Sequence, residues 1–441
     1  MICSCNKLVD VKLPVDELVS STVFADSATA VSTVNGMYSQ LYNGDGNSIY
    51  GYRISTLPAE SADELMPVKN SFDQFYSNSL VAGNSDVSDL WSQSYHVIYL
   101  ANSIIDGLQA SKTLSASLKN QLTAEAKFVR AFCDFYLVNY FGRVPIVNSS
   151  NVTISNNAPA SSVNEVYAQM ISDLSEARDA LPADYSLSGG DRTRVNRYVA
   201  SAMLARVYLY NQQWAQAVGE STNVIAQNGL YALQTDLNTV FLANSQEAIW
   251  QLYTNVRGCT FFAQQLIPTG LGVPNYTTNP ILENSFETGD QRKSKWLSSV
   301  DYLGVTYTFP YKYKSITNNN TEFDMALRLS EQYLIRAEAN SQLNNVIAAQ
   351  TDLNVVRKRA GLAVTGATDK ASLLLAVEHE RQVELFCEYG HRWLDLKRTG
   401  QADVILKAEK PLGWQSTDQL YPIPQSARST NNALYQNPGY N

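Results

Sequence analysis

The chain has 441 residues, of which 45% are hydrophobic and 17% are charged, a composition typical of folded globular proteins rather than of disordered chains. The formal net charge is −8, and no basic stripe is present to neutralise phosphates, which argues against nucleic acid as a partner. No run of about 18 apolar residues occurs, so the sequence predicts no membrane-spanning helix.

The chain begins with MICSC, which contains Cys3 and Cys5. These residues resemble the end of a lipobox, in which Cys5 would carry the acyl chains. The charged and apolar regions of a complete signal peptide are missing, and we interpret this as a truncated start. From the residues alone, an unstructured tail with two idle thiols is an equal alternative.

Small residues recur at a fixed spacing in two segments that are offset by 132 positions: Ala205, Ala217 and Gly229, then Ala337, Ala349 and Gly361. Each set lies in a predicted helix, turn and second helix, at 197–218 and at 331–353. Small residues where two antiparallel helices cross are typical of tetratricopeptide repeats. A fainter third copy combines a helix around Ala131 with a second helix that ends at Pro182. The segment from 376 onwards could form a fourth.

Turn-forming Gly, Pro, Asn and Ser residues interrupt these helices at 43–90 and 231–324, where we expect irregular inserts. The second insert also contains two strand patterns. EAIWQLYTN at 247–255 is one. In YTFPYKYK at 307–314, aromatic residues alternate with polar ones, and Pro310 predicts an edge or irregular strand.

The 26 tyrosines outnumber the 14 phenylalanines, and many lie in the inserts. A tyrosine ring presents an apolar face and a polar edge, which suits sugars and peptide backbones. We therefore expect the two inserts to form a binding platform. The candidates are Tyr50, Tyr52, Phe75 and Tyr76 in the first insert, and Tyr276, Trp296, Tyr302 and Tyr307 in the second. For each residue taken singly, ordinary packing is the alternative.

The most informative stretch is ERQVELFCEYGHRWLDLKRTG at 380–400. Glu380 and Glu384 lie in the apolar stripe of a predicted helix at 371–389, and buried carboxylates need cationic partners. The nearest cations follow a turn at Gly390 and are Arg392, Lys397 and Arg398. This pattern favours a structural cluster of ion pairs over a catalytic carboxylate pair.

No motif for catalysis, a metal or a cofactor is present. The three histidines do not form an HExxH spacing, and neither a GxSxG elbow nor a phosphate-binding loop occurs. NGDGN at 43–47 lacks the later Glu of an EF-hand, and a plain turn explains it better. The cysteines lack the paired spacing of a zinc site. We therefore expect no cofactor, no metal and no enzymatic activity.

The block at 380–400, with LYPIP at 420–424 and NPGY at 437–440, resembles the carboxyl end of the SusD/RagB family of surface lipoproteins of Bacteroidetes. Residues 5–42 resemble the opening of the same family. The resemblance implies a lipidated Cys5, attachment to the outer membrane facing the exterior, and a SusC-like TonB-dependent transporter on which the protein sits as a lid. It says almost nothing about the ligand.

The predicted fold is mainly α, a tetratricopeptide-like helical repeat scaffold with long irregular inserts and a few short strands. Residues 1–5 would end the lipoprotein signal. Residues 6–441 would form one SusD-like domain, divided into a helical part (6–230), an insert lobe (231–325) and a second helical part (326–441).

The expected function is the non-catalytic capture of oligosaccharides and their delivery to the transporter. The alternatives are the same architecture carrying peptides, a surface glycoside hydrolase, and a repeat scaffold that binds a protein segment.

Overall fold

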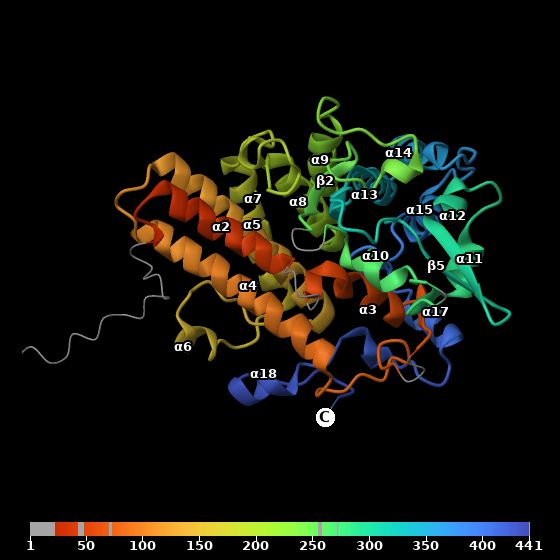
Figure 1. The fold of residues 1–441 in the computed structure, drawn as a ribbon, viewed down its shortest axis with the longest axis horizontal. Helices are drawn as coiled ribbons and strands as arrows, with labels where there is room; N and C mark the ends of the chain where they lie inside the picture. The colour runs from red at the N-terminus through yellow and green to blue at the C-terminus, as the bar shows by residue number, and fades with distance from the viewer. Residues whose placement is uncertain (1–22, 43–47, 70–72, 255–257, 271, 441) are drawn as a thin grey trace, which may run out of the picture.

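A row of antiparallel helix pairs forms the frame of the molecule (Figure 1). The computed structural model describes residues 23–42, 48–69, 73–254, 258–270 and 272–440. The helices of the first half are α2 (Ser27–Leu41), α3 (Ile54–Ser61), α4 (Ser85–Ala110), α5 (Ala116–Phe141), α6 (Val152–Ser155), α7 (Val163–Ala180), α8 (Arg197–Tyr210) and α9 (Trp214–Ile225). Those of the second half are α10 (Phe261–Leu266), α11 (Pro280–Ser285), α12 (Gln291–Trp296), α13 (Leu329–Gln342), α14 (Val346–Arg359), α15 (Lys370–Glu384), α16 (His391–Arg398), α17 (Ala402–Glu409) and α18 (Gln425–Thr430).

The two strongest predicted repeats are confirmed as helix pairs. Ala205 in α8 and Ala217 in α9 are fully buried, and so are Ala337 in α13 and Ala349 in α14. The small alanine side chain lets the two helices of each pair approach closely, and this close approach buries it. Gly361 follows α14 with φ of +83°, a conformation that favours glycine.

The fainter repeats are also present, as α5 with α7 and as α15 with α16. Side-chain caps begin several of these helices. The Ser162 hydroxyl accepts from the Glu165 backbone N–H at 3.3 Å, while the Glu165 carboxylate accepts from the Ser162 N–H at 2.7 Å. Successive pairs then pack on one another, α5 on α7, α7 on α8, α9 on α13, and α13 on α15, which gives the continuous stack of a solenoid. The fold class predicted from the sequence is confirmed.

Within the described residues, three short antiparallel strand pairs complete the fold: β1 (Leu65–Pro67) with β3 (Tyr276–Thr278), β2 (Ala248–Leu252) with β6 (Asp324–Arg328), and β4 (Leu297–Tyr302) with β5 (Val305–Pro310). The prediction of a strand at 247–255 is confirmed by β2. The predicted strand at 307–314 ends early, at Pro310, and its polar face is not solvated throughout. Lys312 is 1% exposed and binds the Glu388 carboxylate.

The main hydrophobic core lies between the helices of the repeat stack, and a second core lies under the inserts around α10 to α12. Trp91 belongs to the main core near the start of α4, and its ring meets Phe141 edge to face with 5.1 Å between centroids.

The last segment of the chain runs back across the first half (Figure 1, blue beside red and orange). The Tyr421 N–H donates to the Tyr140 carbonyl at 2.8 Å, and the Asn437 amide donates to the Phe141 carbonyl at 2.9 Å. Residues 420–440 therefore cover the end of α5.

Candidate functional site

The two inserts predicted to carry the binding platform are joined by main-chain pairing. β1 of the first insert pairs with β3 of the second, with Pro67 opposite Tyr276. The hydrogen bond from the Val68 N–H to the Asn275 carbonyl, at 2.8 Å, extends this pair. The surface formed by the first insert, β3 and the β4–β5 hairpin is called the insert face below.

Tyr52 and Tyr276 are half-buried on the insert face, and Glu60 lies close to them. Burial raises the pKa of the Tyr276 hydroxyl, and the charges of Glu60 and Tyr52 add to this effect. Burial also raises the pKa of Glu60 well above its usual range, with Asp73 contributing next. Neither carboxyl oxygen of Glu60 accepts a hydrogen bond from any residue that the structure describes. Glu60 is 0% exposed, so its carboxyl group lies below the surface and is not available to a ligand.

Tyr76 lies at another edge of this surface. The Lys410 ammonium is 5.2 Å from the centroid of the Tyr76 ring, and it also donates to the Glu60 carbonyl at 2.7 Å. Burial lowers the pKa of Lys410 to about 8 and raises the pKa of neighbouring Glu409 to about 7. Lys410 thus ties the C-terminal part of the chain to the insert face.

Tyr302 and Tyr307 lie on the β4–β5 hairpin. Tyr302 is exposed at the hairpin end, and Tyr307 is half-buried opposite Val300. The Thr277 hydroxyl donates to the Thr308 carbonyl at 2.7 Å, so this hairpin lies against β3. The two tyrosines extend the insert face beyond Tyr276.

Tyr50, Phe75 and Trp296 do not belong to this surface. Their exposed fractions are 1%, 2% and 0%, so their rings have no free face for a ligand. The Tyr50 hydroxyl is hydrogen-bonded to that of Ser94 at 2.8 Å, and the Trp296 indole N–H donates to the Leu237 carbonyl at 3.0 Å. For these three candidates the expectation of a ligand contact is wrong, and ordinary packing is correct.

Four polar residues of the inserts could supply hydrogen bonds to a ligand: Arg53, Asp63, Asn70 and Arg257. Arg53 is paired with Asp89 at 2.6 Å, at the start of α4. Asp63 is held by Arg392 in a buried ion pair. Asn70 and Arg257 lie outside the described residues, as do Cys5 and the segment 43–47.

The carboxylates of the 380–400 block form a buried ion-pair cluster, as predicted. Glu384 is paired with three guanidinium groups, those of Arg292, Arg328 and Arg359. Burial by itself would raise the pKa of Glu384, but these cations hold it well below the usual range. Glu380 is paired with Arg292 at 2.7 Å and with Arg357 at 3.2 Å. The arrangement is structural, because every oxygen is engaged away from solvent.

The predicted partners of Glu380 and Glu384 were wrong. Arg392 binds Asp63 at 2.6 Å, and Arg398 binds Glu338 of α13. Lys397 donates to the carbonyl of Asn139. The nearby cations are thus used to attach α16 to other parts of the fold, and the two glutamates are neutralised by arginines from distant segments.

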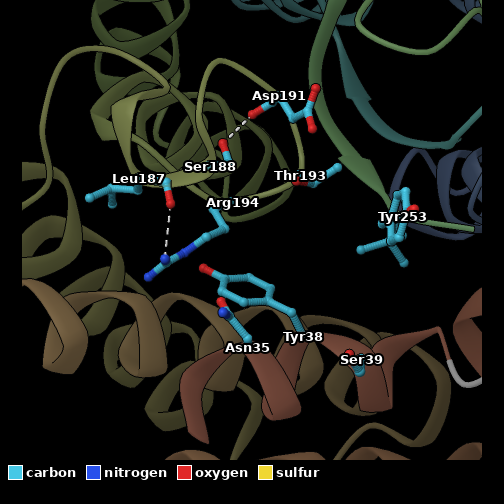
Figure 2. A pocket seen from close by; sticks show the side chains of 10 residues that line it. Asn35, Tyr38, Ser39, Leu187, Ser188, Asp191, Thr193, Arg194 and Tyr253 are labelled. Atoms are coloured by element: carbon cyan, nitrogen blue, oxygen red, sulfur yellow. Dashed lines mark hydrogen bonds between the residues drawn. The ribbon is translucent and has the colours of Figure 1, made fainter. Parts of the chain in front are cut away.

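A separate pocket with a volume of about 300 Å³ lies between α2 and the loop after α7 (Figure 2). Asn35, Tyr38 and Ser39 form one wall and Arg194 part of the other, while Tyr253 closes one side. No sequence motif marks these residues as a site. Tyr253 follows a recognised strand, but nothing local shows that α2 and the loop at 187–194 come together.

Among the residues that the structure describes, no group of three or more His, Cys, Asp or Glu side chains is placed to hold a metal ion. His391 is buried, which lowers its pKa well below the usual range, with Arg206 adding to the effect. His379 faces the Ser285 carbonyl at 2.7 Å. Within the same described part of the chain, no helix combines the length and apolar character needed to cross a membrane.

The fold and this surface define a helical-repeat protein whose two inserts join to form one face. Comparison with known proteins identifies the family. The model described as "SusD family" matches residues 256–440, and the model described as "Starch-binding associating with outer membrane" matches residues 10–209. The chain belongs to the SusD family.

Individual relatives agree along the whole length. A SusD-like protein of Formosa agariphila is 26% identical in sequence, and the alignment covers 99% of this chain and 96% of that protein. A SusD superfamily structure from Bacteroides vulgatus is 21% identical with a TM-score of 0.83, covering 95% of this chain and 100% of that one. The structure of a laminarin-binding SusD-like protein is 24% identical in sequence with a TM-score of 0.77. The match covers 94% of this chain and 99% of that chain. The two structures show the same fold.

Proposed function

We propose that this protein is a non-catalytic cell-surface lipoprotein that captures oligosaccharides and delivers them to a SusC-like TonB-dependent transporter. The observation that carries the proposal is the match of residues 10–209 to a starch-binding, outer-membrane-associated family, together with the SusD match of residues 256–440. A relative of the same fold is described as laminarin-binding, which supports a glycan as the class of ligand.

The insert face is the proposed capture surface. Tyr52, Tyr76 and Tyr276 present partly exposed rings from both inserts, and Tyr302 and Tyr307 extend this surface along the hairpin. Aromatic rings stack on the C–H faces of sugars, while the hydroxyl groups of these tyrosines can hydrogen-bond to sugar hydroxyls.

Binding is tested by affinity electrophoresis and calorimetry of the purified protein against a panel of glycans, with a peptide mixture as the comparison. Saturable binding of a glycan supports the proposal. Binding of the peptides alone would replace oligosaccharides by peptides as the cargo. Release of reducing ends from a bound glycan would contradict the non-catalytic assignment.

Attachment to the membrane is assigned to acylation of Cys5. In cells that express the full precursor, the wild-type protein is expected in the outer-membrane fraction, and Cys5→Ala is expected in the soluble fraction. Outer-membrane fractionation of the variant would contradict the anchor. Delivery is tested separately, by asking whether the protein extracted in mild detergent co-purifies with a large β-barrel transporter.

A further inference from the structure

We propose that the pocket in Figure 2 is a second glycan site, which takes one sugar residue of a neutral oligosaccharide. The proposal rests on the proposed function, and it adds both a location and a charge class for the ligand. The pocket lies outside the insert face and shares none of its candidate tyrosines.

The size of the pocket favours a small ring over a protein segment. Its volume of about 300 Å³ is at the lower end of the range of small-molecule sites. Apolar and polar side chains are mixed in its walls, with Leu187 and Leu252 beside Ser188 and Thr193. This mixture suits a sugar residue, which has both C–H faces and hydroxyl groups.

The charges around the pocket favour a neutral sugar. Arg194 is the cation in its lining, and its guanidinium donates to both oxygens of buried Glu125, at 2.9 and 2.6 Å. The Tyr38 hydroxyl donates to the same carboxylate at 3.0 Å. The charge of Arg194 is neutralised by Glu125. The carboxylate of Asp191 therefore gives the pocket lining a net negative charge. An acidic sugar would be repelled at this position.

The walls present groups that match the two aspects of a sugar. Tyr253 is 46% exposed, and its ring is held edge to face against Phe323 with 5.1 Å between centroids. On α2, the exposed side chains of Asn35 and Ser39 are one helical turn apart and make no hydrogen bond with any described residue. Asp191 uses one carboxylate oxygen to accept from Asn244 at 2.6 Å, and its other oxygen is open to a ligand hydroxyl.

The second insert forms part of the pocket, through Leu252 and Tyr253. Ser39 lies about one turn before Tyr42, whose ring stacks on Phe261 of α10 with 5.0 Å between centroids. The helix that forms one wall of the pocket is therefore packed against the second insert.

The test uses the full protein and calorimetry with maltoheptaose, laminarihexaose and an oligogalacturonate. Tyr253→Ala removes the aromatic wall, and Asp191→Asn removes the charge while keeping the oxygen that accepts from Asn244. For the neutral glycan that binds the wild type, each change is expected to raise Kd about five- to tenfold. Tyr435→Ala is the matched control, because this tyrosine is 85% exposed and lies outside both sites.

The outcomes separate the pocket from the proposed function. If the wild type binds a neutral glycan and both pocket variants bind it as tightly as the wild type, the proposal that the pocket binds glycan is overturned and the proposed function stands. If the wild type binds neither these glycans nor any other member of the glycan panel, both are overturned. If Asp191→Asn weakens the neutral glycan and the wild type does not bind the oligogalacturonate, the pocket is supported. Tighter binding of the acidic glycan than of the neutral ones would overturn the charge class.

Discussion

Arg392 and Asp63 are 329 residues apart in the chain and form a buried ion pair through two parallel hydrogen bonds, at 2.8 and 2.6 Å. Arg392 is in α16, within the block that resembles the family most closely, and Asp63 follows α3 in the first insert. The family block therefore supports the insert face from beneath, although it contributes no exposed ring to that face.

Arg392→Ala is expected to lower the free energy of unfolding by about 3–5 kcal/mol, because it leaves the Asp63 carboxylate buried without a countercharge. The measurement is urea unfolding followed by tryptophan fluorescence. Lys127→Ala is the control, since Lys127 pairs with Glu176, whose side chain is 57% exposed, and such pairs contribute about 0–1 kcal/mol. Equal losses in the two variants would contradict the structural role of Arg392.

Glu384→Gln is expected to destabilise the protein on the same scale, about 3–5 kcal/mol, because three buried guanidinium groups would lose one shared negative charge. Thermal unfolding followed by circular dichroism measures this effect. Wild-type stability in this variant would show that Glu384 is not needed to balance the cluster.

Glu64 should give stability a pH dependence of identifiable sign. Burial, with Asp63 contributing next, raises its pKa from 4.5 to about 8. The native state holds this proton more tightly than the unfolded state, so the contribution to stability is present at low pH and is lost as pH rises through that range. Glu64→Gln should flatten the decline, by up to about 1.4 kcal/mol per pH unit. Urea unfolding of the wild type and of Glu64→Gln at a series of pH values from 4.5 to 8 measures the difference. The same slope of stability against pH in both proteins would contradict the raised pKa of Glu64.

Tyr276→Ala and Tyr50→Ala should separate binding from folding. Tyr276 is half-buried on the insert face, so its loss is expected to raise Kd for the bound glycan about tenfold with little change in fold. Tyr50 is in the core, and its loss is expected to cost about 3–5 kcal/mol of stability. Calorimetry and urea unfolding of both variants provide the comparison. If Tyr276→Ala binds the glycan as tightly as the wild type, Tyr276 does not belong to the capture surface.

The helical scaffold could be predicted because its signal is local. Ala205 and Ala217, like Ala337 and Ala349, mark the crossing points of adjacent helices, and the hydrophobic period shows which face is buried. The meeting of the two inserts was also expected, from their shared aromatic content. Their pairing through β1 and β3 was not, since strands of three residues carry almost no pattern.

The ion-pair partners and the exposure of individual side chains were harder to predict than the helices and strands. Glu384 is neutralised by Arg292, which is 92 residues away, and no spacing in the sequence connects them. Trp296 ends the polar stretch QRKSKW, which looks solvent-exposed, yet its ring is buried among Lys312, Arg328 and Arg359. Tertiary packing decides both cases.

The return of residues 420–440 across α5 sets an order for folding. Tyr140 and Phe141 are made early, but the groups that pair with their carbonyls, on Tyr421 and Asn437, are made almost last. Contacts between such distant parts of a chain form slowly, and the covered end of α5 stays open until they form. Folding would therefore be completed only after residues 420–440 have been made, and the uncovered end of α5 would need protection from aggregation until then.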